Sequence, residues 1–236
     1  GAEFNGQKCG TFGDIGTLSF YPAHHMTMGE GGMVIVNNRL HKKTALSIRD
    51  WGRDCWCDPG QNNTCGKRFD WQLGDLPYGY DHKYIYSNLG YNMKATDMQA
   101  ALGCSQFEKL PAFIHARQEN AKFYLESFSD LADHLILPEF PEKAEPSWFA
   151  FPITIREHVD KLKFVAYLEE AKIETRQVFG GNILKQPGFK NIKHRISGNL
   201  QGTNKIMART IFFGVYPGIN TEMREYVAEK VKEFFK

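Results

Sequence analysis

The segment from Arg53 to Tyr80 is the strongest constraint on the fold, because its apolar residues follow neither a helical nor a strand period. The segment is rich in Gly, Asp, Asn, Pro and aromatic residues. A stretch of this length without regular structure is uncommon inside a compact domain, and where it occurs it usually carries function. The elements that build the domain must therefore lie on either side of it, and the segment itself is a candidate site.

Elements with clear patterns precede this segment. Two short apolar runs, Gly16–Tyr21 and Gly32–Asn37, are predicted to be buried strands around a loop. The run from Arg39 to Gly52 is predicted to be a helix that ends near the glycine.

The helical period returns after the segment. The spacing of Thr96 and Gln99 fits a capping box, in which each side chain satisfies a free backbone donor at a helix start. A second, long helix is predicted from Pro111 to Leu131, because proline is tolerated in a first turn. Short apolar runs then indicate strands, with a helix near Asp160–Lys172, and the chain ends in an amphipathic helix over 221–236.

This order of elements predicts an α/β fold in two parts. Residues 1–134 are expected to be the C-terminal part of a large domain with a mostly parallel sheet, and residues 135–236 a small C-terminal α/β domain. The chain opens without Met, in what is predicted to be a loop. We therefore expect it to be the C-terminal portion of a larger protein.

Composition excludes several classes of function. The 236 residues are 42% hydrophobic, which is enough for a sizeable core, and 29 basic against 27 acidic residues leave a net charge of +2. The sequence has no long run of one charge sign, so nothing in it indicates a nucleic-acid or membrane partner. The first residues lack the charged and apolar regions of a secretory signal, so a cytoplasmic protein is expected.

The stretch "SFYPAHHMTMGEGG", Ser19 to Gly32, is the first candidate site. A serine at a strand end and the basic residue His24 five positions later are expected at one rim of a loop with a Gly-rich return. Together they offer a hydroxyl and an imidazole, which can accept a proton near neutral pH. The alternative is a buried serine and two loop histidines with purely structural contacts.

Three cysteines form the second candidate site. Cys55, Cys57 and Cys65 follow a C-x-C-x7-C spacing inside the segment without a period. Clustered thiolates suit zinc or an iron–sulfur cluster, and the alternative is three unpaired thiols. Cys104 lies on a predicted helix with an apolar face and is expected in the core, and Cys9 stands apart in the opening loop.

The first site resembles that of the DegT/DnrJ/EryC/StrS family of sugar aminotransferases, which bind pyridoxal phosphate on the aspartate-aminotransferase (type I) fold. The run "GYNMKATDMQAALG" from Gly90 and "FFGVYPGIN" near the C-terminus are also similar to this family. The resemblance implies that Ser19 contacts the cofactor phosphate. It also implies that Asn92 reaches the cofactor of a neighbouring subunit, and hence a homodimer.

The resemblance places His24 where the family has the lysine that bonds to the cofactor. Imidazole has no primary amine, so the cofactor is expected to stay non-covalently bound as pyridoxamine 5′-phosphate and to form its Schiff base with a keto sugar. His24 is then the base that moves a proton, and transamination becomes dehydration at C-3. His25 is expected to be its structural neighbour.

Histidine together with the cysteine spacing is similar to the iron–sulfur 3-dehydratases of this family. That likeness implies a CDP-4-keto-6-deoxy-D-glucose substrate, a [2Fe–2S] cluster on Cys55, Cys57 and Cys65, and electrons from a flavin/iron–sulfur reductase, in 3,6-dideoxyhexose biosynthesis. A cluster needs four protein ligands. The register of the family places the fourth cysteine, and the Asp that pairs with the cofactor ring, before Gly1.

Two other functions remain open at this point. One is a cluster-free GDP-4-keto-6-deoxymannose 3-dehydratase with incidental cysteines. The other is a non-catalytic scaffold whose cysteines bind zinc.

Three further places in the sequence have less definite expectations. Arg176 is either a partner for a nucleotide diphosphate or an exposed arginine without a specific contact. Tyr21 either lines the sugar site or packs in the core. Residues 81–83, Asp-His-Lys, are predicted to be a solvated turn without a role.

Overall fold

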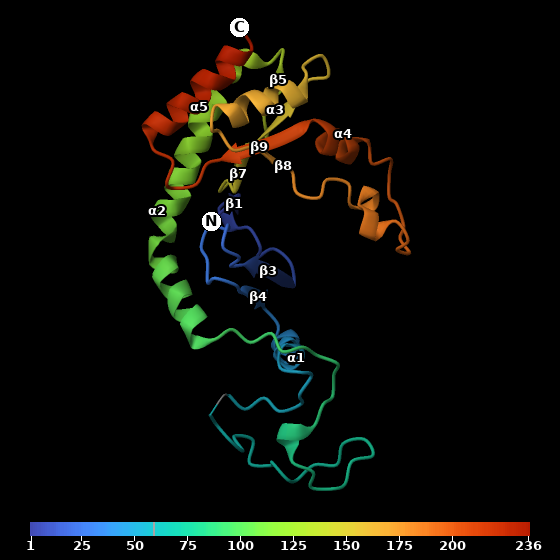
Figure 1. Ribbon diagram of the computed structural model, residues 1–236. Coiled ribbons are helices and arrows are strands. Elements are labelled where there is room, and N and C mark those ends of the chain that lie inside the picture. Colours follow the sequence, from blue (N-terminus) through green and yellow to red (C-terminus); the bar gives the residue numbers. More distant parts are fainter. Residues whose placement is uncertain (59) are drawn as a thin grey trace. The chain divides into compact units, whose positions relative to one another are not determined.

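The computed structural model describes residues 1–58 and 60–236 (Figure 1). These residues divide into two compact units, one of Gln7–Phe107 and one of Gly1–Gly6 with Glu108–Lys236. The division falls inside one long helix, α2, which spans Asp97–Ser127. The domain boundary after residue 134 stays a prediction.

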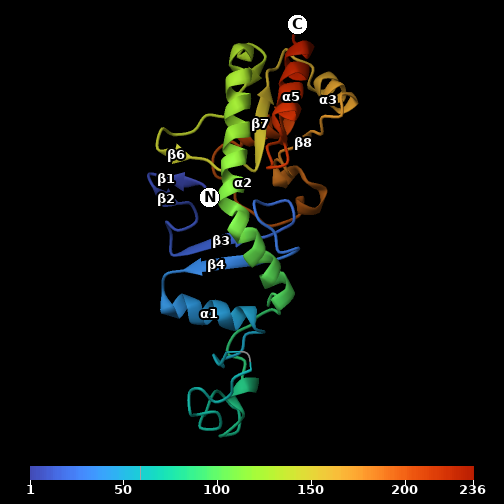
Figure 2. The same cartoon turned by 90° about the vertical axis from the view of Figure 1, so that its left-hand side faces the viewer.

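A hairpin and a helix form the regular part of the 7–107 unit. Strand β3 (Ile15–Ser19) pairs antiparallel with β4 (Gly32–Val36), so that Ser19 lies opposite Gly32. Helix α1 (Arg39–Arg49) follows and contacts β4 (Figure 2). The side chain of Asn38 caps α1 by accepting a hydrogen bond from the Leu40 N–H at 2.7 Å. The short strand β2 (Gln7–Lys8) precedes the hairpin.

Both predicted strands are therefore present, but the prediction that they are buried is wrong. Most residues of β3 and β4 are exposed, and Ile15 and Val34 keep more than half of their surface accessible. The cause is that β3 and β4 form a two-stranded sheet within the described residues. A two-stranded ladder has two open edges and too few neighbours to cover both of its faces.

Helix α1 ends three residues before the expected Gly52, because the chain turns sharply there. Trp51 and Gly52 both have positive φ, +58° and +84°. A Cβ on Gly52 would lie 1.8 Å from the carbonyl oxygen of Asn88, so only glycine allows this close approach of the two backbone segments. The N–H groups of Ser87 and Asn88 both donate to the Gly52 carbonyl, at 3.0 and 3.1 Å.

The absence of regular structure after Gly52 is confirmed. Residues 53–58 and 60–80 contain no helix or strand, and the next element is the short 3-10 helix η1, His82–Tyr84.

Helix α2 is one element where two helices were predicted. The capping box at its start is confirmed: the Thr96 N–H donates to Gln99 Oε1 at 2.8 Å, and the Gln99 N–H donates to Thr96 Oγ1 at 3.3 Å. Pro111 lies inside the helix, not in a first turn. Proline inside a helix removes one hydrogen bond and costs about 3 kcal/mol. The fully buried Tyr124 of α2, and Phe128 directly after the helix, contribute burial that offsets this cost.

The second unit is built on a four-stranded antiparallel sheet. Its order is β5 (Leu135–Ile136), β7 (Ala150–Ile155), β9 (Thr210–Gly214) and β8 (Arg176–Gln177). Strand β1 (Glu3–Phe4) pairs antiparallel with β6 (Ala144–Glu145). The prediction of a mostly parallel sheet is thus wrong for the strand pairs of the described residues, because apolar periodicity carries no information about strand direction.

Helices pack around this sheet to form the core (Figure 2). The remaining elements are α3 (Lys161–Glu170), α4 (Gln201–Arg209), α5 (Thr221–Phe234), η2 (Ser129–Leu131), η3 (Ile183–Lys185) and η4 (Pro187–Phe189). Buried residues of α2, α3 and α5 meet those of β7 and β9 in one apolar cluster. The predicted helices at 160–172 and 221–236 are confirmed. Over the described residues, none of the helices combines the length and the apolar character needed to cross a membrane.

Candidate functional site

The loop after β3 brings Ser19 and His24 together, as the sequence predicts. The Phe20 N–H donates to the Gly31 carbonyl at 2.9 Å, and the Met28 N–H donates to the Phe20 carbonyl at 3.0 Å, which closes the loop at its base. The ring nitrogen Nδ1 of His24 lies 3.3 Å from the carbonyl oxygen of Ser19. The serine side chain is exposed at the strand end, where its Oγ accepts the Tyr21 N–H at 3.3 Å.

This geometry determines what the His24 ring can do chemically. A carbonyl oxygen only accepts hydrogen bonds, so the contact requires the proton to be on Nδ1. The lone pair of the neutral ring is then on Nε2, which becomes the basic nitrogen. Tyr21 packs edge-on against the His24 ring, with ring centroids 5.7 Å apart, so it supports the imidazole and is itself exposed, not in the core.

Asn92 is held at the C-terminal end of α1. It forms an antiparallel bridge with Asp50, and the N–H groups of Tyr91 and Met93 donate to the carbonyls of Ile48 and Arg49 at 2.8 and 3.0 Å. The Asn92 side chain is exposed. Its role toward the cofactor of a neighbouring subunit stays a prediction, because the structure is that of one chain.

Two of the three clustered cysteines are in contact. The thiols of Cys55 and Cys57 share a hydrogen bond, and Cys57 Sγ lies 3.0 Å from Oγ1 of Thr64, the residue before Cys65. Burial raises the pKa of the Cys55 thiol, whereas hydrogen bonding to Thr64 lowers that of Cys57. The charged residues that line a pocket of about 370 Å³ beside the pair are Arg49, Arg53, Lys83, Lys94, Asp50 and Asp58.

A complete metal site is not formed by the residues that the structure describes. No group of three or more His, Cys, Asp or Glu side chains has a metal-binding arrangement among residues 1–58 and 60–236. The predicted set is therefore assembled only in part: Cys55 and Cys57 are together, and Cys65 follows the residue that contacts Cys57. All three cysteines are half-buried, whereas Cys9 and Cys104 are exposed. The expectation that Cys104 is in the core is wrong, because it lies on an open face of α2.

The turn at residues 81–83 is not merely solvated, so that prediction is also wrong. His82 is 2% exposed, and its Nε2 lies 2.6 Å from Asp54 Oδ2. Trp71 stacks on its ring with centroids 4.7 Å apart, and Trp56 meets it edge-on at 5.3 Å. The signal in the sequence was the two tryptophans of the segment without a period, because large aromatic rings usually find a packing partner.

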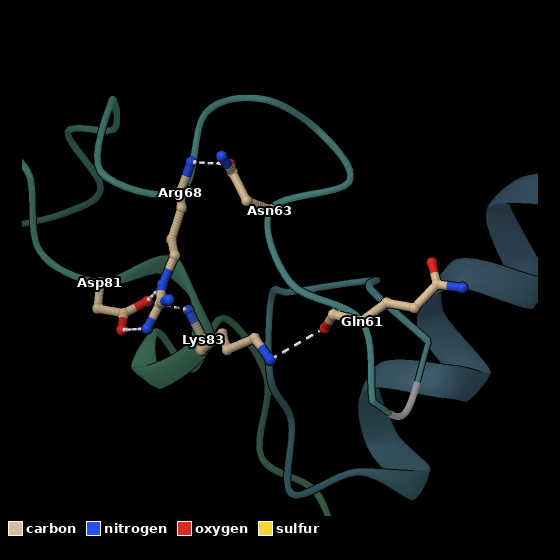
Figure 3. Close-up of polar contacts among 5 residues, drawn as sticks. All are labelled: Gln61, Asn63, Arg68, Asp81 and Lys83. Carbon is tan, nitrogen blue, oxygen red and sulfur yellow. Dashed lines mark hydrogen bonds and ion pairs between the residues drawn. The ribbon is translucent and has the colours of Figure 1, made fainter.

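Charged contacts join the same turn to residues 61–68 (Figure 3). Arg68 binds Asp81 through two hydrogen bonds, Nε to Oδ1 at 2.9 Å and Nη2 to Oδ2 at 2.5 Å. Lys83 Nζ donates to the carbonyl of Gln61 at 3.1 Å, and the Arg68 N–H donates to Asn63 Oδ1 at 2.9 Å. The stretch before and after Cys65 is thereby tied to η1.

The Arg68–Asp81 pair predicts a pH dependence. The hydrogen bond from Arg68 lowers the pKa of Asp81 from its ordinary value of 3.8 to about 2. A carboxyl group with a lowered pKa stabilises the folded segment above its ordinary pKa, and that stabilisation is lost as the pH falls from 3.8 through about 2. Arg68→Met should move this acid transition to higher pH, as measured by tryptophan fluorescence. An unchanged transition would contradict the assignment.

Arg176 lies in the other unit, on β8. Its guanidinium forms an ion pair with Glu174, and the side chain is 69% exposed. The structure thus gives Arg176 a local partner, and a contact with a nucleotide diphosphate stays a prediction.

Comparison with known proteins finds relatives that match along the whole of this chain. The model of the DegT/DnrJ/EryC1/StrS aminotransferase family matches residues 1–232. The lipopolysaccharide biosynthesis protein RfbH of Salmonella typhimurium is 53% identical over 100% of this chain and 54% of its own length. A dTDP-4-dehydro-2,6-dideoxy-D-glucose 3-dehydratase of Saccharopolyspora spinosa is 48% identical over 99% of this chain and 51% of its own length.

A solved structure gives the same result for the fold. The GDP-4-keto-6-deoxy-D-mannose-3-dehydratase of E. coli with bound hydrated PLP superposes with a TM-score of 0.82 at 29% identity, over 98% of this chain and 57% of that one. The fold is therefore that of PLP-dependent aminotransferases. The chain spans about half the length of the curated relatives it matches.

Proposed function

Because the chain belongs to the DegT/DnrJ/EryC1/StrS aminotransferase family, we propose that the protein containing it removes the C-3 hydroxyl of a nucleotide-linked 4-keto-6-deoxyhexose. The observation that carries the proposal is the contact of His24 with the Ser19 carbonyl, at the position where the resemblance places the family's lysine. The names of the relatives, two 3-dehydratases and a lipopolysaccharide biosynthesis protein, support the same chemistry.

His24 is the proposed base. With its proton fixed on Nδ1 by the Ser19 carbonyl, the ring presents Nε2 as the atom that accepts a proton. The exposed Ser19 hydroxyl fits a phosphate oxygen, and Asn92 is proposed to reach the cofactor of a second copy of the chain, which makes the protein a homodimer. Pyridoxamine 5′-phosphate, when bound, supplies an amine for the keto group of the sugar and a ring that takes up electrons.

The cysteines are proposed to provide the reducing side of the reaction. Replacing a hydroxyl group by hydrogen releases water and consumes two electrons and two protons, so an external reductant is required. The donor set fits a cluster in part: two thiols in contact and a third close along the chain supply three of the four ligands that a [2Fe–2S] centre needs. The fourth ligand is proposed to come from outside these 236 residues, and the reductant to be a flavin/iron–sulfur reductase.

A cluster-free dehydratase is the second candidate. Two observations favour it: the described residues form no three-ligand metal group, and the E. coli structure of similar fold is named as a GDP-4-keto-6-deoxy-D-mannose-3-dehydratase.

For the first candidate, the iron–sulfur enzyme, we propose the CDP-linked sugar, CDP-4-keto-6-deoxy-D-glucose, as the substrate.

The test uses the full-length protein purified without oxygen. Iron, acid-labile sulfide and zinc are measured per chain, and the protein is then incubated with CDP-, dTDP- and GDP-linked 4-keto-6-deoxyhexoses and pyridoxamine phosphate. The proposal predicts about two iron and two sulfide per chain. It also predicts a C-3-deoxygenated product from the CDP sugar that requires an electron donor. Turnover without iron would favour the cluster-free enzyme, and zinc without turnover would favour a scaffold.

A further inference from the structure

The segment that carries the cysteines has a side-chain cluster of its own around the buried His82. Asp54, Trp56, Trp71 and His82, here called the His82 cluster, bring together residues from both ends and the middle of the segment. Residues 53–58 and 60–80 contain no helix or strand, and only a few backbone hydrogen bonds tie them to residues 82–86. The Asp54 N–H donates to the Ile85 carbonyl at 2.9 Å, and the His82 N–H donates to the Arg68 carbonyl at 3.0 Å. Side-chain contacts must therefore provide much of the remaining order.

His82 is the centre of this cluster. Its imidazole is 2% exposed, and burying a polar ring without a partner would cost about 1–3 kcal/mol. Asp54 provides the partner: Oδ2 lies 2.6 Å from His82 Nε2, and Oδ1 accepts the Ser87 hydroxyl at 2.9 Å. Trp71 covers one face of the ring in a nearly parallel stack, with an interplanar angle of 20°. The imidazole ring thus has both a hydrogen-bond partner for its nitrogen and an aromatic packing partner for its face.

The cluster reaches the cysteines through alternation along the chain. Asp54 and Trp56 contact His82, whereas Cys55 and Cys57, which alternate with them, contact each other. Each of the two thiols thus directly follows a residue that is held against His82. Fixing residues 54 and 56 therefore restricts the backbone that carries both thiols.

We propose that His82 is a positioning residue that holds the Cys55–Cys57 pair in a ligand-ready arrangement before any metal is present. The inference rests on the proposed function for the identity of the metal centre, but not for the arrangement of the thiols. It assigns a role to a histidine that is neither a ligand nor a base. The prediction concerns the protein without metal, so it has readouts that do not depend on turnover.

The experiment compares variants of the full-length protein after chelation under reducing conditions. Labelling of each cysteine by iodoacetamide is followed by peptide mass spectrometry, and hydrogen–deuterium exchange is measured over residues 53–58 and 80–87. His82→Gln should increase the labelling rates of Cys55 and Cys57 about tenfold, because a lost buried partner promotes local opening. Trp71→Ala should have the same effect, whereas Trp71→Phe should preserve the stack and stay close to the wild type.

Controls are available within the same chain. Labelling of the exposed Cys9 and Cys104 should not change, and neither should exchange in β7 and β9, which reports any general loss of folding. His194→Gln, at an exposed histidine whose Nδ1 lies 2.7 Å from the carbonyl oxygen of Ile192, should behave as the wild type. Iron retention on reconstitution should fall in His82→Gln and be preserved in Trp71→Phe.

The two proposals fail in different ways. Wild-type labelling and exchange in His82→Gln would overturn the role of His82. A wild-type protein that binds no iron would overturn the cluster part of the proposed function, while the labelling result would still decide whether His82 positions the thiols.

Discussion

His24→Lys should convert the site from non-covalent to covalent cofactor binding and slow 3-dehydration severely. The lysine amine can bond to the cofactor aldehyde, which imidazole cannot do. Losing a general base at this position should lower kcat by roughly 10²–10⁴-fold. Borohydride treatment followed by intact mass measurement should find the cofactor attached to the variant and not to the wild type, and turnover of the keto sugar should be measured on the same sample.

His25→Lys is the matched control for this prediction. It places the same amine one position along the loop, next to His24, whose Nδ1 contacts the Ser19 carbonyl oxygen. The control should bind the cofactor non-covalently and retain its base. If the covalent adduct forms in His25→Lys instead, the register of the two histidines is reversed. Normal dehydration by His24→Lys would show that His24 is not the base.

Cys57→Ser should remove iron from the protein and stop reductant-dependent turnover. A serine hydroxyl keeps the hydrogen bond with Thr64, since Oγ1 lies 3.0 Å from the sulfur it replaces, but it is a poor ligand for iron in a cluster. We expect iron and sulfide to fall from about two per chain to background. Binding of pyridoxamine phosphate should be unaffected, because Ser19 and His24 lie on a different loop.

Cys104→Ser provides the comparison for that variant. This thiol is exposed on α2 and takes no part in the cysteine segment, so its iron content and turnover should match the wild type. Full iron in Cys57→Ser would exclude Cys57 as a ligand. A wild-type protein that holds zinc would assign the cysteines a structural role.

Local features could be predicted from the sequence, and features built by distant contacts could not. Ser19 and His24 are five residues apart on one loop, and the capping box of Thr96 and Gln99 spans three positions, so spacing alone determines both. Asp54 and His82 are 28 positions apart in a segment without a period. No local pattern shows that they meet, and the turn was therefore interpreted as solvated.

Pro111 is an instance of tertiary packing prevailing over a local rule. Proline normally marks a helix start or a break, which led to the prediction of two helices. The structure has a single helix because residues on both sides of Pro111 keep the same helical path, and aromatic side chains of its later turns are fixed in the core. The burial of β3 and β4 was predicted wrongly for a related reason. Apolar composition indicates that a strand favours burial, but it does not show whether neighbouring elements cover the strand.

The close approach of Gly52 to Asn88 has a consequence for how the cysteine segment can change. Backbone hydrogen bonds from Ser87 and Asn88 to Gly52 close the residues between them into a loop, and this closure is its neck. The entropy of closing such a loop varies only slowly with its length. Insertions or deletions within the loop are therefore compatible with an unmoved Asn92, provided that the neck keeps its glycine. The segment that we propose to carry the redox chemistry can therefore vary in length while the residues proposed to bind the cofactor keep their places.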